Sequence, residues 1–231
     1  MYSKFDAKVH SDSYSWDSIP KDWIIYTSRD FGSTIQSPFV HVAFAISPDR
    51  KKVMELPNCQ IYKSNLDVRD ASQMIQEIEK QIYQKLGKRV YRRISDHAGA
   101  EQLVLKNDKL KAVPGKKDVV DGIGQVKTWL AEQRIIVLKP PFSLFHDPDT
   151  NFMGKASEGF DEWQLYSYKD QVAQERNPDK ADEPKKGSDH YMDCVRYLLM
   201  DISTGIIRST GTNVFENQST DIFTTGGHGL W

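Results

Sequence analysis

A group of acidic and basic side chains lies in the stretch GSDHYMDCVRYLLM, residues 187–200. Apolar residues recur there at helical spacing and predict an amphipathic helix, with Ser188 as its N-cap. The apolar face is formed by Met192, Val195, Leu198 and Leu199. The neighbouring face carries Asp189, His190, Asp193 and Tyr197. Asp193 lies beside the apolar face and beyond the first turn, where a carboxylate needs a basic side chain or a metal ion as partner. A solvated helix edge is the alternative interpretation.

Two further aspartates stand where predicted strands end in turns of small residues. Asp30 precedes Gly32, and Asp96 precedes Gly99. Ligand sites gather at the carboxyl ends of strands in α/β sheets. If the two strands are parallel neighbours, both carboxylates emerge at one edge, and a helix across that edge adds Asp193. Three such carboxylates need neutralising charge, which two divalent cations supply in phosphoryl-transfer enzymes. Oxygen ligands favour Mg²⁺ or Mn²⁺. The alternative is that each aspartate is an ordinary turn or cap residue.

Other candidate sites give weaker signals. His97 and His190 are possible zinc ligands, but Cys59 and Cys194 are badly spaced for a structural zinc site, and a buried reduced thiol is expected for Cys194. The candidate phosphate contacts are Arg92, Arg93, Lys106, Lys109, Lys111, Lys116 and Lys117. The lysines alternatively form a solvated face. No GxxxxGK[ST] motif occurs, so the chain encodes no ATP site of that kind.

The elements that must position these residues alternate in type. Strands are predicted at 23–28 and 39–46, with a hairpin partner at 52–55 and 59–63 that Pro57 interrupts, joined by short turns as an antiparallel meander. A helix over 71–86 ending at Gly87 follows, then a strand at 90–95, a helix capped by Asp118, a strand at 134–138 and the final helix. Alternation of strands and helices implies parallel pairing. We therefore predict an α/β fold, a mixed central sheet with helices on both faces.

Length and charge bound the function. The 231 residues suit one domain with extensions, and the net charge of −1 means that any nucleic-acid site is a local patch. No apolar run reaches the ~20 residues of a membrane span, and the N-terminus lacks the apolar core of a signal peptide.

Several segments resemble one family, the C-terminal nuclease domain of the large terminase subunit of tailed bacteriophages. The matching segments are YSKFDAKVH with IPKDW, RDFG, SDHAGAEQ, KKDVVDGIGQVKTWLAEQRIIV, DEWQLYSY and SDHYMDCVRYLL. The resemblance implies a ribonuclease H-like fold and an endonuclease that cuts concatemeric viral double-stranded DNA during packaging, by two-metal phosphodiester hydrolysis. It implies that Asp30, Asp96 and Asp193 bind Mg²⁺ or Mn²⁺, with Asp189 as an additional candidate, and that His190 lies near the metals.

The same resemblance implies a domain plan and partners. Residues 1–22 are expected to be an extended lead-in from a missing ATPase domain, 23–203 the nuclease domain, and 204–231 a flexible C-terminal tail. Expected partners are double-stranded DNA, the terminase ATPase domain, the terminase small subunit and, through the tail, the portal protein, with no membrane. The expected location is the cytoplasm of the infected bacterial host. The rival hypotheses are another ribonuclease H-like enzyme, such as a junction resolvase or integrase-like strand transferase, and a non-catalytic portal-docking module.

Overall fold

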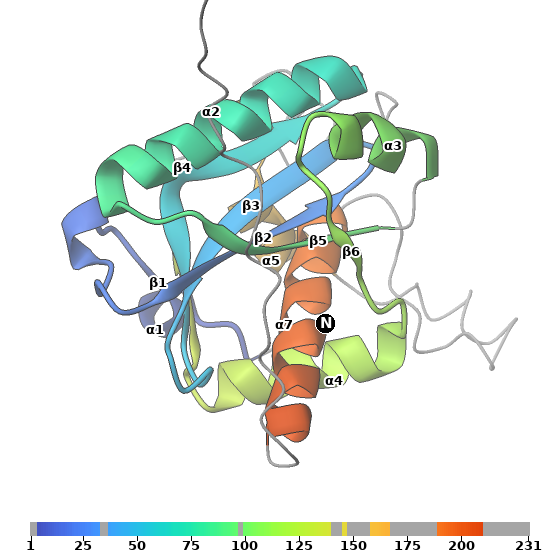
Figure 1. Ribbon diagram of the computed structural model, residues 1–231. Helices are drawn as coiled ribbons and strands as arrows, with labels where there is room; N and C mark the ends of the chain where they lie inside the picture. The colour runs from blue at the N-terminus through green and yellow to red at the C-terminus, as the bar shows by residue number, and fades with distance from the viewer. Residues whose placement is uncertain are drawn as a thin grey trace, which may run out of the picture.

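The computed structural model describes residues 4–32, 37–96, 99–139, 145–146, 158–166 and 189–209, without the side chains of 145–146 and 205–209. Its elements follow the chain in the order α1 (Ala7–His10), β1 (Ser11–Asp12), η1 (Trp16–Ser18), β2 (Ile24–Asp30), β3 (Phe39–Ile46), β4 (Val53–Lys63), α2 (Val68–Leu86), β5 (Val90–Ser95), α3 (Gly99–Asn107), β6 (Val113–Pro114), α4 (Val119–Ala131), β7 (Ile135–Leu138), β8 (Phe145–His146), α5 (Gly159–Leu165) and α7 (His190–Ser209). Figure 1 shows these elements arranged around one twisted sheet.

The sheet has the order β1-β7-β4-β3-β2-β5-β6, and β8 pairs with β4. Strands β2, β3 and β4 pair antiparallel, which confirms the predicted meander. The later strands β5, β6 and β7 join the sheet parallel to their neighbours. In particular, β5 is the parallel neighbour of β2, which meets the condition set for bringing Asp30 and Asp96 to one edge.

Helices cover both faces of this sheet, so the predicted layering is also confirmed (Figure 1). One face packs against α2 and α3, and the other packs against α4, α5 and α7. The central strand β3 is buried along its whole length and supplies both cores by alternation. Val42 and Phe44 face the helices that include α7, whereas Ala43 and Ala45 face α2. Helix α7, which carries Asp193, therefore packs on a strand that is buried along its whole length.

Strand β4 accommodates a proline that was expected to interrupt it. The two halves of the strand both pair with β3, but Val42 is opposite Gln60 while Phe44 is opposite Glu55. The four residues between Glu55 and Gln60, which include Pro57, thus face a single residue of β3 and form a bulge. Asn58 has a φ of 54° there, the left-handed conformation that asparagine tolerates.

Two stretches contain more regular structure than the sequence pattern indicated. The segment 1–22, expected to be extended, forms α1 and β1, and β1 adds to the sheet beside β7. An aromatic residue of this segment packs on the domain, since Phe5 stacks on Trp163 with ring centroids 4.8 Å apart. The segment 99–117 forms α3 and β6. Strands of two residues are too short to show a period, which is why β1 and β6 were missed.

Helix boundaries and caps agree with the sequence at several points. Gly87 ends α2 with a φ of 66°, and the Asp118 side chain accepts a hydrogen bond from the amide of Asp121 at the start of α4. Helix α7 continues to Ser209, past residue 203, where the nuclease domain was expected to end. Three of the sequence-based expectations fall on residues outside the described part of the chain, namely Ser188, His97 and residues 210–231.

Two further features of the described part of the chain are the state of its cysteines and the length and polarity of its helices. Cys59 and Cys194 are both buried free thiols, as predicted for Cys194. None of the helices there is both long enough and apolar enough to span a lipid bilayer.

Candidate active site

Two aspartates meet at one edge of the sheet because their strands are parallel neighbours. Arg29 of β2 is in register with Ser95 of β5, so the next residues, Asp30 and Asp96, lie side by side at the strand ends. The Asp96 amide donates a hydrogen bond to the carbonyl of Arg29 across this junction, at 3.2 Å. Side chains alternate along a strand, so both aspartates share the sheet face of Tyr26 and Ile94, which pack under α7.

Helix α7 crosses that face and brings residues at intervals of four against it. Asp193, Tyr197 and Asp201 form this stripe, because residues four apart lie on the same side of a helix. Asp201 accepts two hydrogen bonds of 2.7 Å from the Arg92 guanidinium of β5, which fixes the far end of the stripe. The near end places Asp193 over the edge that carries Asp30 and Asp96. The helix face that the sequence singled out is thus the face turned toward the two strand ends.

Tyr197 lies within electrostatic reach of all three aspartates. Burial raises the pKa of its phenol, and the charges of Asp30, Asp193 and Asp96 raise it further. Since such effects fall with distance, Tyr197 lies close enough to all three acids for their charges to act on its phenol. The Tyr197 ring packs directly on Gly115, where a Cβ atom would lie 2.6 Å from the ring's Cγ.

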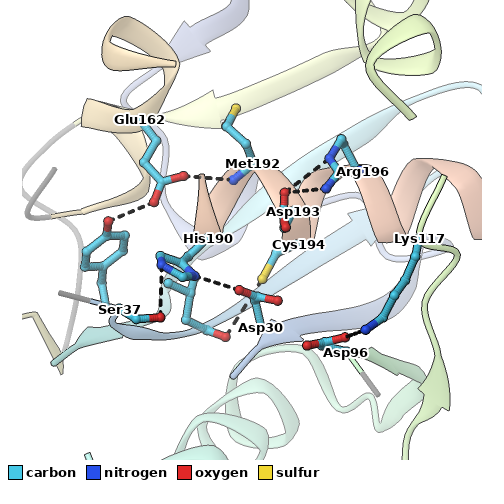
Figure 2. A network of polar contacts seen from close by, with 12 residues as sticks. Asp30, Ser37, Asp96, Lys117, Glu162, His190, Met192, Asp193, Cys194 and Arg196 are labelled. Atoms are coloured by element: carbon cyan, nitrogen blue, oxygen red, sulfur yellow. Dashed lines mark hydrogen bonds and ion pairs between the residues drawn. The ribbon is translucent and has the colours of Figure 1, made fainter. Parts of the chain in front are cut away.

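Asp30 forms a hydrogen-bonded pair with His190. The Nδ1 atom of His190 lies 2.7 Å from Oδ2 of Asp30, and its Nε2 lies 3.3 Å from the hydroxyl of Ser37 (Figure 2). Burial lowers the pKa of His190, but the hydrogen bond and charge of Asp30, with Glu162 and Asp189, outweigh burial and raise the pKa to about 9. The imidazole is therefore protonated at neutral pH and supplies a positive charge to Asp30 when no metal is bound.

Asp193 forms an ion pair within its own helix. The guanidinium of Arg196 donates to Oδ1 of Asp193 from Nη2 and, at 3.2 Å, from Nε. Burial raises the pKa of Asp193 to about 6, opposed by Arg196 and supported by repulsion from Asp30 and Asp189. The sequence indicated that Asp193 needs a basic partner or a metal ion; Arg196, three residues on, is the basic partner.

Asp96 also has a basic partner. The Nζ atom of Lys117, in the link between β6 and α4, lies 2.7 Å from Oδ1 of Asp96. Figure 2 shows the resulting arrangement, in which each of the three aspartates faces a different basic side chain.

The three carboxylates do not form one cluster in this metal-free arrangement. Within the residues described, no three His, Cys, Asp or Glu side chains lie close enough together to hold a metal ion. The donor chemistry nevertheless suits Mg²⁺ or Mn²⁺, because the three candidates are all carboxylates. Asp189, the additional candidate, directly precedes α7, and its carbonyl accepts a hydrogen bond of 2.7 Å from the Asp193 amide.

Solved structures show what this arrangement resembles. The large terminase of the thermophilic bacteriophage D6E is 20% identical to the chain, with a TM-score of 0.64, and the match covers 87% of this chain and 45% of that one. The P22 large terminase nuclease domain is 13% identical, with a TM-score of 0.60 over 89% of this chain and 96% of its own. The chain has the fold of a large-terminase nuclease domain. No protein-family model and no curated protein sequence matches it.

A third structure with the terminase nuclease fold was solved with bound Mn. The nuclease domain of g2p, the large terminase of bacteriophage SPP1, is 16% identical, with a TM-score of 0.51 over 83% of this chain and 96% of its own. The ribonuclease H-like fold implied by the sequence is confirmed by these likenesses. The chain spans about half the length of the D6E large terminase, 45% of it, and almost the whole of the two isolated nuclease domains.

The predicted phosphate contacts divide into two groups within this fold. Arg92 and Arg93 each form a bidentate pair with an acid of the chain, Asp201 and Glu79, over distances of 2.6 to 2.7 Å. Such pairs occupy the guanidinium edge that would bind a phosphate. The lysines are all exposed and follow the α3–β6 region toward Asp96: Lys106, Lys109, Lys111, Lys116 and Lys117.

One functional residue was missed by sequence reasoning: Glu162, a buried carboxylate of α5 that holds the first turn of α7. Glu162 accepts hydrogen bonds from the Tyr62 hydroxyl at 2.8 Å and from the Met192 amide at 3.0 Å. The second bond satisfies an amide that a helix N-terminus leaves unpaired. Burial raises the pKa of Glu162 to about 7 despite these bonds. Glu162 thereby fixes the helix turn that carries His190 and Asp193.

Proposed function

We propose that this chain is a Mg²⁺- or Mn²⁺-dependent DNA endonuclease domain that cuts concatemeric viral double-stranded DNA during genome packaging. The observation that carries this proposal is the placement of Asp30 and Asp96 at adjacent parallel strand ends beneath Asp193 of α7. The likeness of the fold to terminase nuclease domains supports it.

The residues that would hold two divalent cations are Asp30, Asp96 and Asp193, with Asp189 as an additional candidate. Bound cations would activate the attacking water and stabilise the charge on the leaving 3′ oxygen. His190 orients the carboxylate of Asp30, as a side chain next to a metal ligand commonly does. Arg196 holds the carboxylate of Asp193 in the direction of the strand ends.

The exposed lysines give the domain its means of binding DNA. The net charge of the chain is −1, so attraction to phosphate must be local. Lys117 pairs with Asp96, and Lys106, Lys109, Lys111 and Lys116 precede it along the α3–β6 region. Contacts to phosphates alone bind duplex DNA without regard to sequence, which suits an enzyme that cuts a long concatemer.

The domain is proposed to act as one part of a DNA-packaging motor. The proposed partners are the ATPase part of a large terminase, the terminase small subunit and, through the C-terminal tail at 204–231, the portal, in the cytoplasm of an infected bacterium. The support is the likeness to one part of the D6E large terminase, of which this chain covers 45%.

Cleavage of supercoiled plasmid and linear duplex tests the proposal. Nicked and linear products should appear with Mn²⁺ or Mg²⁺ and disappear when EDTA is added. A four-way junction of the same sequence should not be cut faster than the duplex. Failure to cut with either metal, or cutting that EDTA does not stop, would contradict the proposal, and faster cutting of the junction would favour a resolvase.

A further inference from the structure

The three basic partners of the candidate site differ in how freely they can move. The Lys117 side chain is 57% exposed, whereas that of Arg196 is 4% exposed and that of His190 15%. A buried charge cannot leave its partner without a large desolvation cost, but an exposed lysine exchanges its partner for water easily. Asp96 is therefore the acid whose internal partner can be replaced.

The Arg196 side chain is held between Asp193 and helix α4. Its aliphatic stem packs on Gly122 of α4, where a Cβ atom would lie 3.2 Å from Cδ of Arg196. His190 is likewise held from two sides, by Asp30 and Ser37. These two cations are fixed parts of the site.

The backbone next to Lys117 is held in place, whereas the Lys117 side chain is largely exposed. Two residues before it, the Gly115 amide donates a hydrogen bond of 2.8 Å to the carbonyl of Ser95, the residue just before Asp96. The Tyr197 ring covers the same glycine. The backbone of this link is thus attached beside Asp96, while the long Lys117 side chain that reaches Asp96 is largely exposed to solvent.

We propose that Lys117 is an exchangeable counter-ion of Asp96, which neutralises this acid in the metal-free protein and leaves it when a divalent cation binds. The inference rests on the proposed function, since it assumes that Asp96 is a metal ligand. Metal binding and the Lys117–Asp96 pair then compete for one carboxylate. A consequence is that the metal affinity of the free domain is held below what its carboxylates alone would give.

Binding of Mn²⁺ to the full chain without DNA tests this competition, with free Mn²⁺ measured by electron paramagnetic resonance. The informative variant is Lys117→Met, which keeps the length of the side chain and removes its charge. Lys116→Met is the matched control, because Lys116 loses the same charge but its Nζ donates to the Thr204 hydroxyl at 2.8 Å instead of to an acid. Lys117→Arg keeps a cation at the position and should bind Mn²⁺ like the parent.

The expected result is that Lys117→Met binds Mn²⁺ about two- to fivefold more tightly than Lys116→Met, the range that an exposed ion pair supports. Equal affinities of the two variants, or weaker binding by Lys117→Met, would overturn the inference while leaving the proposed function intact. If the parent itself binds no Mn²⁺ at millimolar concentration, the proposed metal dependence fails first, and the inference fails with it.

Discussion

His190 and Asp30 are 160 residues apart in sequence, and the Nδ1 atom of one lies 2.7 Å from Oδ2 of the other. The contact joins the first residue of α7 to the last residue of β2. It therefore fixes where the helix that carries Asp193 begins relative to the strand end that carries Asp30. The contact thus adds to the bonds of Glu162 and Asp201 in setting the relative position of the two candidate ligands.

Replacing His190 should reduce cleavage more than it reduces stability. His190→Ala removes the group that orients Asp30, and losing such an outer partner of a ligand typically costs 10- to 100-fold in activity or metal affinity. His190→Asn places an amide near the position of Nδ1 and should retain part of the activity. Initial rates of plasmid cleavage in Mn²⁺, with melting temperatures measured in EDTA, separate the two effects. Parental cleavage by His190→Ala would remove His190 from the site.

Two glycines should respond to alanine with opposite signs. Gly115→Ala places a Cβ atom 2.6 Å from the Tyr197 ring, so the ring or the β6–α4 link must move, at a cost of about 1–3 kcal/mol. Gly124→Ala, inside α4, meets no atom within 4 Å and should raise the free energy of unfolding by up to about 1 kcal/mol, from helix propensity. Urea unfolding in EDTA measures both. A Gly115→Ala protein as stable as the parent would show that Tyr197 does not pack as described.

The domain should be more stable at pH 5.5 than at pH 8. Burial raises the pKa values of Glu55 and Glu162 to about 7, although both accept hydrogen bonds. An unfolded glutamate has a pKa of about 4.3. Between that value and 7 the folded chain keeps protons that the unfolded chain has released, so stability falls as the pH rises through this window. The raised pKa of His190, about 9, acts in the same direction between about 6.5 and 9.

Urea unfolding across this pH range in EDTA measures the effect. Each pKa unit is worth about 1.4 kcal/mol, so each glutamate should contribute on the order of 1–3 kcal/mol. Glu55→Gln and Glu162→Gln should each flatten the dependence, because an amide does not titrate. A parent protein that gains stability from pH 5.5 to pH 8 would show that these carboxyls are not buried as described.

The sequence predicted those parts of the site that depend on local patterns. Asp30 and Asp96 were found because each ends a strand; the alternation of strands and helices predicted parallel pairing, and the structure shows that these two strands are neighbours. The face of α7 with Asp193 followed from helical spacing. What the order of elements determines was thus accessible from one sequence.

The partners of these acids depend on packing and were not predicted. Lys117 was expected to contact DNA, and nothing in its spacing from Asp96 indicates an ion pair, because the two are joined through β6 and the α3–β6 region. The three-residue spacing between Asp193 and Arg196 is compatible with an ion pair on a helix, but such spacing is too common to single out this pair. Glu162 lies in the segment DEWQLYSY, in which the sequence pattern indicated no candidate site residue, and only the tertiary structure places its carboxylate at the start of α7.

The cleavage rate of the aspartate-to-asparagine variants tests the central claim most directly. Asp30→Asn, Asp96→Asn and Asp193→Asn should each lose duplex cleavage in Mn²⁺ while keeping a folded melting transition, because the amide has nearly the same shape but is a poorer metal ligand. Asp70→Asn, an exposed position in the first turn of α2, is the matched control and should cut like the parent. Loss of cleavage in the three site variants alone is the predicted result. Cleavage at the parental rate by Asp30→Asn, Asp96→Asn and Asp193→Asn would contradict the account and place the nuclease site elsewhere.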